Sequence, residues 1–308
     1  MNWGRRTTAV LLLAHGSPDS AEEVPEYLKH VTGGRSLPPQ VVEEITDRYR
    51  LVGSSPLTHW TVEQAIQLEK QLAIPVYIAM RNWKPFIPDV LRKMVRQGIA
   101  HAVIICLAPQ NSRTSVGLYR KAVESNGGRS FSIDFVESWH DHPLLVKAFA
   151  ERLAIGLEAA RREATSRIPV LFTAHSVPQC TISAGDPYQE QARRTAELVA
   201  EAATLESDDW QLAFQSQGVS GGPWIGPRVE DVLTTLSRRG TPGVLVQTIG
   251  FLADHVEVLY DIDIAARKFA QKLGLRLWRA ESLNASPWLT AALADIVRCR
   301  LRASGDEI

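Results

Sequence analysis

The sequence predicts an α/β protein with two similar lobes, each a four-stranded parallel sheet flanked by helices, and an active-site cleft between them. Short apolar runs rich in β-branched residues recur along the chain, separated by amphipathic stretches. Strands that are apolar throughout and alternate with helices are typical of parallel sheets covered on both faces. A second observation is a repeat: Leu12–Pro18 and Phe172–Pro178 both end a strand with Ala-His, followed by a small residue and a proline.

The apolar runs and amphipathic stretches define the expected elements. The strands are expected at 8–14, 75–80, 102–107, 131–137, 169–174, 210–215, 243–248 and 275–280. The helices are expected at 61–72, 86–97, 114–125, 143–163, 187–204, 228–238, 255–273 and 287–302. We expect an N-terminal lobe at 1–130, joined by a C-terminal helix at 287–305, and a second lobe at 131–286. Ligands collect at the carboxyl ends of the strands in such sheets, where His15 and His175 lie.

The composition excludes several classes of protein. Lys and Arg total 34, as do Asp and Glu, so a zero net charge gives no support for binding to nucleic acid. The three cysteines are far apart and predict free thiols in a reducing compartment. Their number excludes a four-cysteine iron–sulfur cluster bound by this chain alone. No apolar run approaches the ~20 residues that span a bilayer, so we expect a cytoplasmic protein, with a peripheral membrane contact left open.

The most informative local segment is Gly250–Asp263, which follows the expected strand at 243–248 and opens a helix with Asp254 at its N-cap. On an α-helix, Asp254, Glu257 and Asp261 would line one face. Hard oxygen ligands beside the imidazole of His255 suit a divalent transition metal. The alternative is a solvated acidic first turn that complements the helix dipole.

His175 ends a strand that is expected to be buried. Its imidazole is able to bind a metal and to accept protons near neutral pH, although a structural role is the alternative. Two glycine- and proline-rich segments, 53–57 and 215–227, are expected to form loops that line the cleft. Neither matches a Walker A or dinucleotide-binding motif, and the chain has no Gly-x-Ser-x-Gly nucleophile motif.

Taken together, these segments resemble the ferrochelatase family nearly end to end. The matching pieces occur in family order: Leu12–Pro18, Asp47-Arg48-Tyr49, Gly53–Leu57, Leu107-Ala108-Pro109, Ser115–Tyr119, Glu137-Ser138-Trp139, Thr173–Pro178, Gln215–Pro227, Asp254–Asp263 and Glu281–Asn284. The Ala-His strand end and the Asp-His-x-Glu helix start are specific when found together. The resemblance implies two Rossmann-like, chelatase-type lobes with a porphyrin in the intervening cleft.

The resemblance also implies roles for individual residues. His175 and Glu257 would be the catalytic, iron-binding pair, with Asp254 and His255 in support and Asp261 extending an acidic path. The residues implied for porphyrin binding are His15, Arg48, Tyr49, Ser55 and Tyr119. Arginine and hydroxyl groups suit the porphyrin propionates because they supply directional hydrogen bonds to carboxylates.

The chain departs from the family pattern at four of its positions. His15 stands where coproporphyrin-type relatives commonly have tyrosine, so its role toward product iron is open. Thr32 replaces an arginine, Asn82 a histidine and Ala265 a carboxylate. These replacements weaken the case for a second, outer metal site.

The implied reaction is the insertion of Fe²⁺, a substrate, into a porphyrin with release of two protons and without a permanently bound cofactor. The length of the 215–227 loop and the lack of an extension after the last helix favour coproporphyrin III. The partners are then the porphyrin and its haem-type product, and a monomer is expected. The alternatives are a protoporphyrin IX ferrochelatase, a cobalt or nickel chelatase of sirohydrochlorin type, and a non-catalytic haem or porphyrin carrier, which His15 as a haem ligand would favour.

Overall fold

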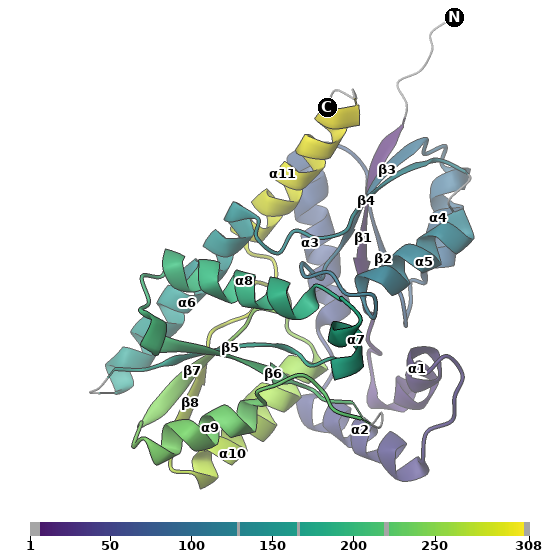
Figure 1. Ribbon diagram of the computed structural model, residues 1–308. Helices are drawn as coiled ribbons and strands as arrows, with labels where there is room; N and C mark the ends of the chain where they lie inside the picture. Colours follow the sequence, from purple (N-terminus) through teal and green to yellow (C-terminus); the bar gives the residue numbers. More distant parts are fainter. Residues whose placement is uncertain (1–6, 128–129, 165–166, 219–221, 305–308) are drawn as a thin grey trace, which may run out of the picture. The chain divides into compact units, whose positions relative to one another are not determined.

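The computed structural model describes residues 7–127, 130–164, 167–218 and 222–304, and Figure 1 traces them as a ribbon. The chain divides into two compact units. The first contains Met1–Pro109, Ser115–Trp139 and Leu289–Ile308, and the second contains Gln110–Thr114 and His140–Trp288. Each unit holds one four-stranded sheet. Residues 219–221 of the expected cleft-lining loop, and residue 305 of the expected last helix, lie outside the described residues.

The sheet of the first unit is parallel, with the order β2-β1-β3-β4. Its strands are β1 (Thr8–Ala14), β2 (Val76–Met80), β3 (His101–Cys106) and β4 (Ser132–Val136). Leu11 and Leu13 pack into a cluster with the helices of one face, while Val10 and Leu12 alternate with them and are also fully buried. Because helices cover both faces, β1 is apolar from Ala9 to Ala14, as the sequence predicted.

Helices cover both faces of this first sheet. On one face α4 (Ile87–Arg96) and α5 (Val116–Gly127) contribute Leu91, Met94 and Val123 to the core. On the other face, α3 (Leu57–Leu72) and α11 (Pro287–Ser304) run side by side, and the Thr290 hydroxyl donates to Gln67 Oε1 at 3.0 Å (Figure 1). The sequence analysis missed η1 (Ala21–Glu23), α1 (Val24–Val31) and α2 (Pro39–Val52).

The second unit repeats this arrangement, with a parallel sheet in the order β6-β5-β7-β8. Its strands are β5 (Val170–His175), β6 (Trp210–Gln215), β7 (Gly243–Thr248) and β8 (Arg276–Arg279). Helices α6 (Pro143–Glu163) and α8 (Tyr188–Ala202) lie on one face of the sheet, and α9 (Val229–Arg238) and α10 (Arg267–Lys272) on the other (Figure 1). Two short helices, α7 (Gln179–Ser183) and η2 (Ser207–Asp209), complete the unit.

The predicted α/β class with two four-stranded parallel sheets is confirmed, and the two sheets share one strand order. The expected lobe boundary at 130/131 is wrong. Strand β4 pairs in parallel with β3, from His101↔Ser132 to Ile105↔Val136, and therefore belongs to the first unit. The expected helix at 255–273 is also different, because it begins as a ten-residue π-helix, η3 (Glu257–Ala266), that continues into α10. Within the described part of the chain, no helix combines the length and apolar character that a bilayer span requires.

Candidate functional site

The candidate site in the second unit lies where two adjacent strands lead away in opposite directions across the sheet. The chain continues from β5 to β6 on one side and from β7 to β8 on the other, and ligands bind at the carboxyl ends of strands at such a point. His175 is the last residue of β5, and the segment from Gly250 to Glu257 follows β7. A Cβ atom at Gly250 would lie 2.9 Å from both Cα and Cβ of Ala174, so glycine allows this segment to pass beside His175.

His175 and Glu257 meet at this position. The Nε2 atom of His175 lies 3.6 Å from Oε2 of Glu257, the first residue of η3, and both side chains are about one-third exposed, at 34% and 38%. The Nδ1 atom of His175 is hydrogen-bonded to the Ser176 carbonyl oxygen, so it carries the proton in the neutral ring. The lone pair of Nε2 is therefore available on the side of Glu257.

A second imidazole approaches the same carboxylate. The Nε2 atom of His255 lies 3.8 Å from Glu257 Oε2, and its Nδ1 lies 3.1 Å from the Ala253 carbonyl oxygen. The Phe251 ring contacts both histidines, with its centroid 4.5 Å from that of His255 and 6.2 Å from that of His175. Two imidazole nitrogens thus flank one carboxylate beside an apolar ring.

Tyr188 supports this group from α8, and the sequence analysis missed it. Burial raises the pKa of Tyr188, a hydrogen bond with the His175 backbone lowers it, and the negative charge of Glu257 raises it further. The net direction is upward, so the phenol stays neutral. Its backbone amide donates to the buried Asp186 at 3.1 Å, which fixes the start of α8. The sequence did not indicate a contact between Tyr188 and His175, because Tyr188 lies in a separate helix and its position there is typical of an ordinary buried helix residue.

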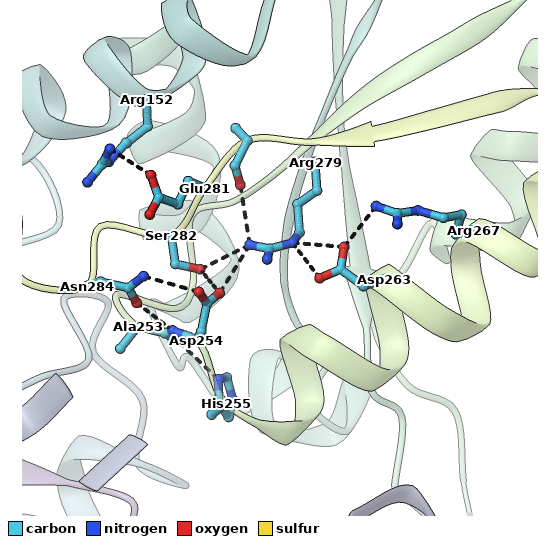
Figure 2. Close-up of polar contacts among 11 residues, drawn as sticks. Arg152, Ala253, Asp254, His255, Asp263, Arg267, Arg279, Glu281, Ser282 and Asn284 are labelled. Carbon is cyan, nitrogen blue, oxygen red and sulfur yellow. Dashed lines mark hydrogen bonds and ion pairs between the residues drawn. The ribbon is translucent and has the colours of Figure 1, made fainter. Parts of the chain in front are cut away.

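Asp254 does not take the position that the sequence predicted. It precedes η3, whose first turn has no side-chain cap, and its carboxylate accepts hydrogen bonds from Arg279, Ser282 and Asn284. Figure 2 shows the Asp254 carboxylate directed toward Arg279, while the His255 ring points away from it. The expected single face of three carboxylates is therefore wrong, because the α-helical spacing on which it relied is absent at this point.

Asp261 keeps a place near Glu257 along the helix. Residues four or five apart follow one another along a π-helix, so Glu257 and Asp261 share a face. The Asp261 carboxylate accepts a hydrogen bond from Ser216, which has a left-handed backbone with φ of 58°. Ser216 directly follows β6, so this hydrogen bond joins η3 to the carboxyl edge of the sheet.

In the first unit, His15 directly follows β1 and is held by Asn82. The Asn82 amide nitrogen lies 3.0 Å from His15 Nε2 and 3.4 Å from Nδ1, and the Asn82 backbone N–H donates to the His15 carbonyl oxygen at 3.0 Å. The Tyr27 ring meets the imidazole edge-on, with 6.3 Å between centroids. Asn82 is only 4% exposed, so its contact with His15 belongs to the interior of the unit and not to its surface.

The remaining residues expected to bind porphyrin also lie in the first unit, in several environments. Tyr49 is buried and its hydroxyl lies 2.9 Å from that of Ser17. Ser55 is buried, and its hydroxyl has no hydrogen-bond partner among the described residues. Arg48 forms an ion pair of 2.7 Å with Glu44 on the same helix. These three side chains offer hydroxyl and guanidinium groups of the kind that bind carboxylates.

Tyr119, also in the first unit, lies beneath the guanidinium of Arg81. The Arg81 Cζ atom is 5.5 Å from the centre of the Tyr119 ring. Burial raises the pKa of Tyr119 and the charge of Arg81 partly opposes this, so the phenol stays neutral and able to donate. The sequence analysis noted Arg81 only as the neighbour of Asn82, and its pairing with Tyr119 was missed.

None of the described residues forms a group of three or more His, Cys, Asp or Glu side chains placed to hold a metal ion. His175, His255 and Glu257 are separated by 3.6 and 3.8 Å at their nearest atoms, and two of the three side chains are partly exposed. Imidazole and carboxylate groups in this arrangement suit proton transfer and transient contact with a divalent ion.

The chain is similar to known proteins over nearly its whole length. The family model for ferrochelatase matches residues 7–301. The chain is 53% identical to the ferrochelatase of Acidobacterium capsulatum over 313 residues, with 96% of each chain covered. It is 33% identical to the coproporphyrin III ferrochelatase of a Geobacillus species, with 97% of this chain and 99% of the relative covered.

A solved structure shares the fold at low sequence identity. SirB from Bacillus subtilis superposes with a TM-score of 0.61 at 14% identity, over 95% of this chain and 94% of the other. The likeness supports the α/β architecture described above. With the family model spanning nearly the whole chain and a relative more than half identical, the chain belongs to the ferrochelatase family, a family of porphyrin metal chelatases.

Proposed function

We propose that this protein inserts Fe²⁺ into coproporphyrin III and releases two protons, with His175 and Glu257 as the catalytic pair. The observation that carries the proposal is the 3.6 Å separation of His175 Nε2 and Glu257 Oε2 at the carboxyl ends of β5 and β7. Metal insertion needs a base for the pyrrole N–H groups and an anionic ligand for the incoming ion. The two side chains supply one of each.

His175 is the proposed acceptor of the pyrrole protons. Its Nδ1–H is engaged by the Ser176 carbonyl oxygen, which leaves Nε2 as the basic atom. A base of this type contributes about 10²- to 10⁴-fold to a proton-transfer step. The adjacent Glu257 carboxylate would stabilise the imidazolium formed when His175 takes a proton.

Glu257 is the proposed transient ligand of Fe²⁺, and His255 shares this task. Both imidazole nitrogens nearest to Glu257 carry lone pairs when the rings are neutral, and nitrogen and oxygen ligands suit a first-row divalent ion. Asp261, on the same face of η3, extends the acidic path and would pass protons toward Ser216 and solvent. A partly exposed site of this kind would release the ion as readily as it accepts it.

The porphyrin is proposed to contact the residues expected in the first unit. Ser55 supports this role, because a buried hydroxyl with no described protein partner suits a propionate oxygen. Tyr119 is a neutral phenol that can donate, Tyr49 offers a hydroxyl group, and Arg48 supplies charge. His15 would contribute a neutral imidazole toward the metal, with Asn82 fixing its orientation.

The choice of coproporphyrin III over protoporphyrin IX rests on two observations. One is the length of the loop between Gln215 and Trp224, and the other is the name of relatives at 33% identity over nearly the whole chain. Coproporphyrin III carries four propionates and protoporphyrin IX carries two, so a site rich in carboxylate-binding groups would favour the former.

An anaerobic insertion assay tests the proposal. The protein is mixed with Fe²⁺ and either coproporphyrin III or protoporphyrin IX, and the loss of free-porphyrin fluorescence is followed. We expect faster loss with coproporphyrin III. Faster loss with protoporphyrin IX would overturn the substrate assignment alone. A protein that metallates neither porphyrin, but inserts Co²⁺ into sirohydrochlorin or binds haem without turnover, would overturn the proposed reaction.

A further inference from the structure

A single arginine joins the two sides of the segment that carries His255 and Glu257. The Arg279 Nε–H donates to both carboxylate oxygens of Asp263, at 3.0 and 2.9 Å, and Nη1 donates to Asp254 Oδ1 at 3.1 Å (Figure 2). The side chain of Arg279 is 12% exposed, and those of Asp254 and Asp263 are 16% and 22% exposed. This is a largely buried ion cluster rather than a surface salt bridge.

The ion cluster fixes the backbone on both sides of His255 and Glu257. Asp254 precedes η3, Asp263 lies within it, and His255 and Glu257 lie between the two carboxylates. Arg279, at the end of β8, therefore holds the approach to the helix and the middle of the helix against one strand end. A shift of either carboxylate would move the backbone that carries Glu257.

Asn284 completes the attachment from the loop that follows β8. Its side-chain oxygen accepts from the Asp254 backbone N–H at 2.8 Å, and its amide nitrogen donates to Asp254 Oδ2 at 3.1 Å (Figure 2). Its own backbone N–H donates to the Leu252 carbonyl oxygen at 2.8 Å. Three hydrogen bonds thus connect Asn284 to residues 252–254, immediately before the site.

The helix that starts at Glu257 needs such external support. A π-helix is rarer than an α-helix, and η3 has no side-chain cap at its N-terminus. Burial works against the charged guanidinium of Arg279, but its hydrogen bond to Asp263 and the charges of Asp254 and Asp263 outweigh this and raise its pKa. Arg279 therefore stays charged, and the start of η3 is held by ionic contacts in place of a cap.

We propose that Arg279 is a positioning residue for metal insertion: through Asp254 and Asp263 it sets where Glu257 and His255 stand relative to His175. The inference rests on the proposed function for its kinetic consequence. Its geometric consequence, an ordered 253–257 segment, stands without that function.

The first test compares Arg279→Gln and Arg279→Lys with Arg267→Gln. Arg267 also pairs with Asp263, at 3.1 Å, but its side chain is 49% exposed and does not reach Asp254, so it is the matched control. We expect Arg279→Gln to lower kcat by about 10- to 100-fold with the KM for porphyrin nearly unchanged, the pattern of a group that acts on the reacting geometry. Arg267→Gln should stay within about twofold of the unaltered protein.

The lysine variant tests whether charge alone is enough. A lysine at 279 keeps the charge but cannot bond to both carboxylates in the planar geometry of a guanidinium, so we expect it to recover little of the lost kcat. Full recovery by Arg279→Lys, or equal losses in Arg279→Gln and Arg267→Gln, would overturn the positioning role.

A double-mutant cycle separates positioning from general damage. If Arg279 acts through Glu257, adding Arg279→Gln to Glu257→Gln should lower kcat by less than about twofold further. A merely structural role predicts that the two losses multiply, and that outcome would overturn the proposal.

Hydrogen exchange provides a readout that needs no turnover. We expect peptides covering residues 252–262 to exchange faster in Arg279→Gln than in Arg267→Gln, since the Asp254 and Asp263 carboxylates both lose the guanidinium that holds them. Should Arg279→Gln fail to fold, Asn284→Gly keeps Arg279 and removes the amide group, and glycine suits the left-handed φ of 49° at this position.

A failure of the proposed function can be distinguished from a failure of the positioning role of Arg279. If the unaltered protein inserts no metal, the proposed function is wrong, while faster exchange in Arg279→Gln or Asn284→Gly would still support the ordering of residues 253–257. Unchanged exchange in both variants would overturn the inference, whatever the activity of the unaltered protein.

Discussion

Asn82 presents its side-chain amide to the ring of His15 while its backbone N–H donates to the His15 carbonyl oxygen, at 3.0 Å in each case. Through these two contacts the buried Asn82 fixes both the ring and the backbone of His15.

Replacing Asn82 should therefore destabilise the first unit and remove the support of the His15 ring. We expect Asn82→Ala to lower the free energy of unfolding by about 1–3 kcal/mol, because a buried donor is lost and His15 loses its partner. Urea unfolding measures this change. The control is Asn126→Ala, whose exposed amide bonds only to the Ala122 carbonyl oxygen one turn away and should cost less than about 0.5 kcal/mol.

Replacing either member of the His175–Glu257 pair should affect turnover far more than binding. We expect His175→Asn and Glu257→Gln each to lower kcat by about 10²- to 10⁴-fold, the range for loss of a positioned acid or base. Porphyrin affinity, measured by fluorescence titration, should change little. His59→Asn is a control at an exposed histidine of the first unit. Near-normal rates in both site variants would show that the pair is not catalytic.

Gly250 should not tolerate a side chain. The Cβ of an alanine would lie 2.9 Å from Cα and Cβ of Ala174, so the strand end that carries His175 would have to shift. We expect Gly250→Ala to lower the free energy of unfolding by about 1–3 kcal/mol, as overpacking does. Thermal unfolding and the insertion assay would record both effects, and unchanged stability would contradict the close approach.

Removing the Tyr188 hydroxyl should loosen the end of β5. Tyr188→Phe keeps the ring in its buried position but deletes the hydrogen bond with the His175 backbone. We expect a loss of about 0.5–1.5 kcal/mol in urea unfolding, together with a lower kcat. A stability equal to that of the unaltered protein would mean that the hydroxyl contributes nothing.

Stability should fall in alkaline solution. Burial raises the pKa of the Cys106 thiol above its ordinary value of 9.0 and raises those of Tyr119 and Tyr188 above 10.0. Groups whose pKa is higher in the folded state stabilise it fully below the unfolded pKa, and this stability is lost as the pH rises above that value. The free energy of unfolding should therefore decline from about pH 9 upward.

A cysteine variant can isolate part of this pH dependence. Cys106→Val should show a shallower decline of the unfolding free energy between pH 8 and pH 11, because one buried titrating group is gone. Cys180 is exposed, so Cys180→Ser should keep the slope of the unaltered protein. Identical slopes for both variants would exclude Cys106 from the effect.

Much of the fold could be predicted because its signals are local. In β1 every residue from Ala9 to Ala14 is apolar and buried, and a short apolar run of this kind is consistent with a buried strand. Helices α1 and α2 escaped prediction because prolines at 25, 38 and 39 interrupt the segment, yet these serve as first-turn residues. The predicted lobe boundary was wrong because the pairing of β4 with β3 joins residues far apart in the sequence, which local patterns do not indicate.

The candidate site shows the same division. The family resemblance paired His175 with Glu257, and the structure has them 3.6 Å apart beside the carboxyl ends of the adjacent parallel strands β5 and β7. Asp254 was misplaced because its partners, Arg279 and Asn284, come from the distant β8 region and because η3 is a π-helix. The contacts that Phe251 and Tyr188 make with the site could not be predicted from the spacing of residues in the sequence.

The return of α11 to the first unit has a consequence for how the chain folds during synthesis. The second unit is complete at Trp288, whereas the first still lacks the helix whose Thr290 bonds to Gln67. The later-made half is therefore finished before the earlier-made half. During synthesis, the surface of α3 around Gln67 therefore lacks its contact with α11 until the residues of α11 have been made.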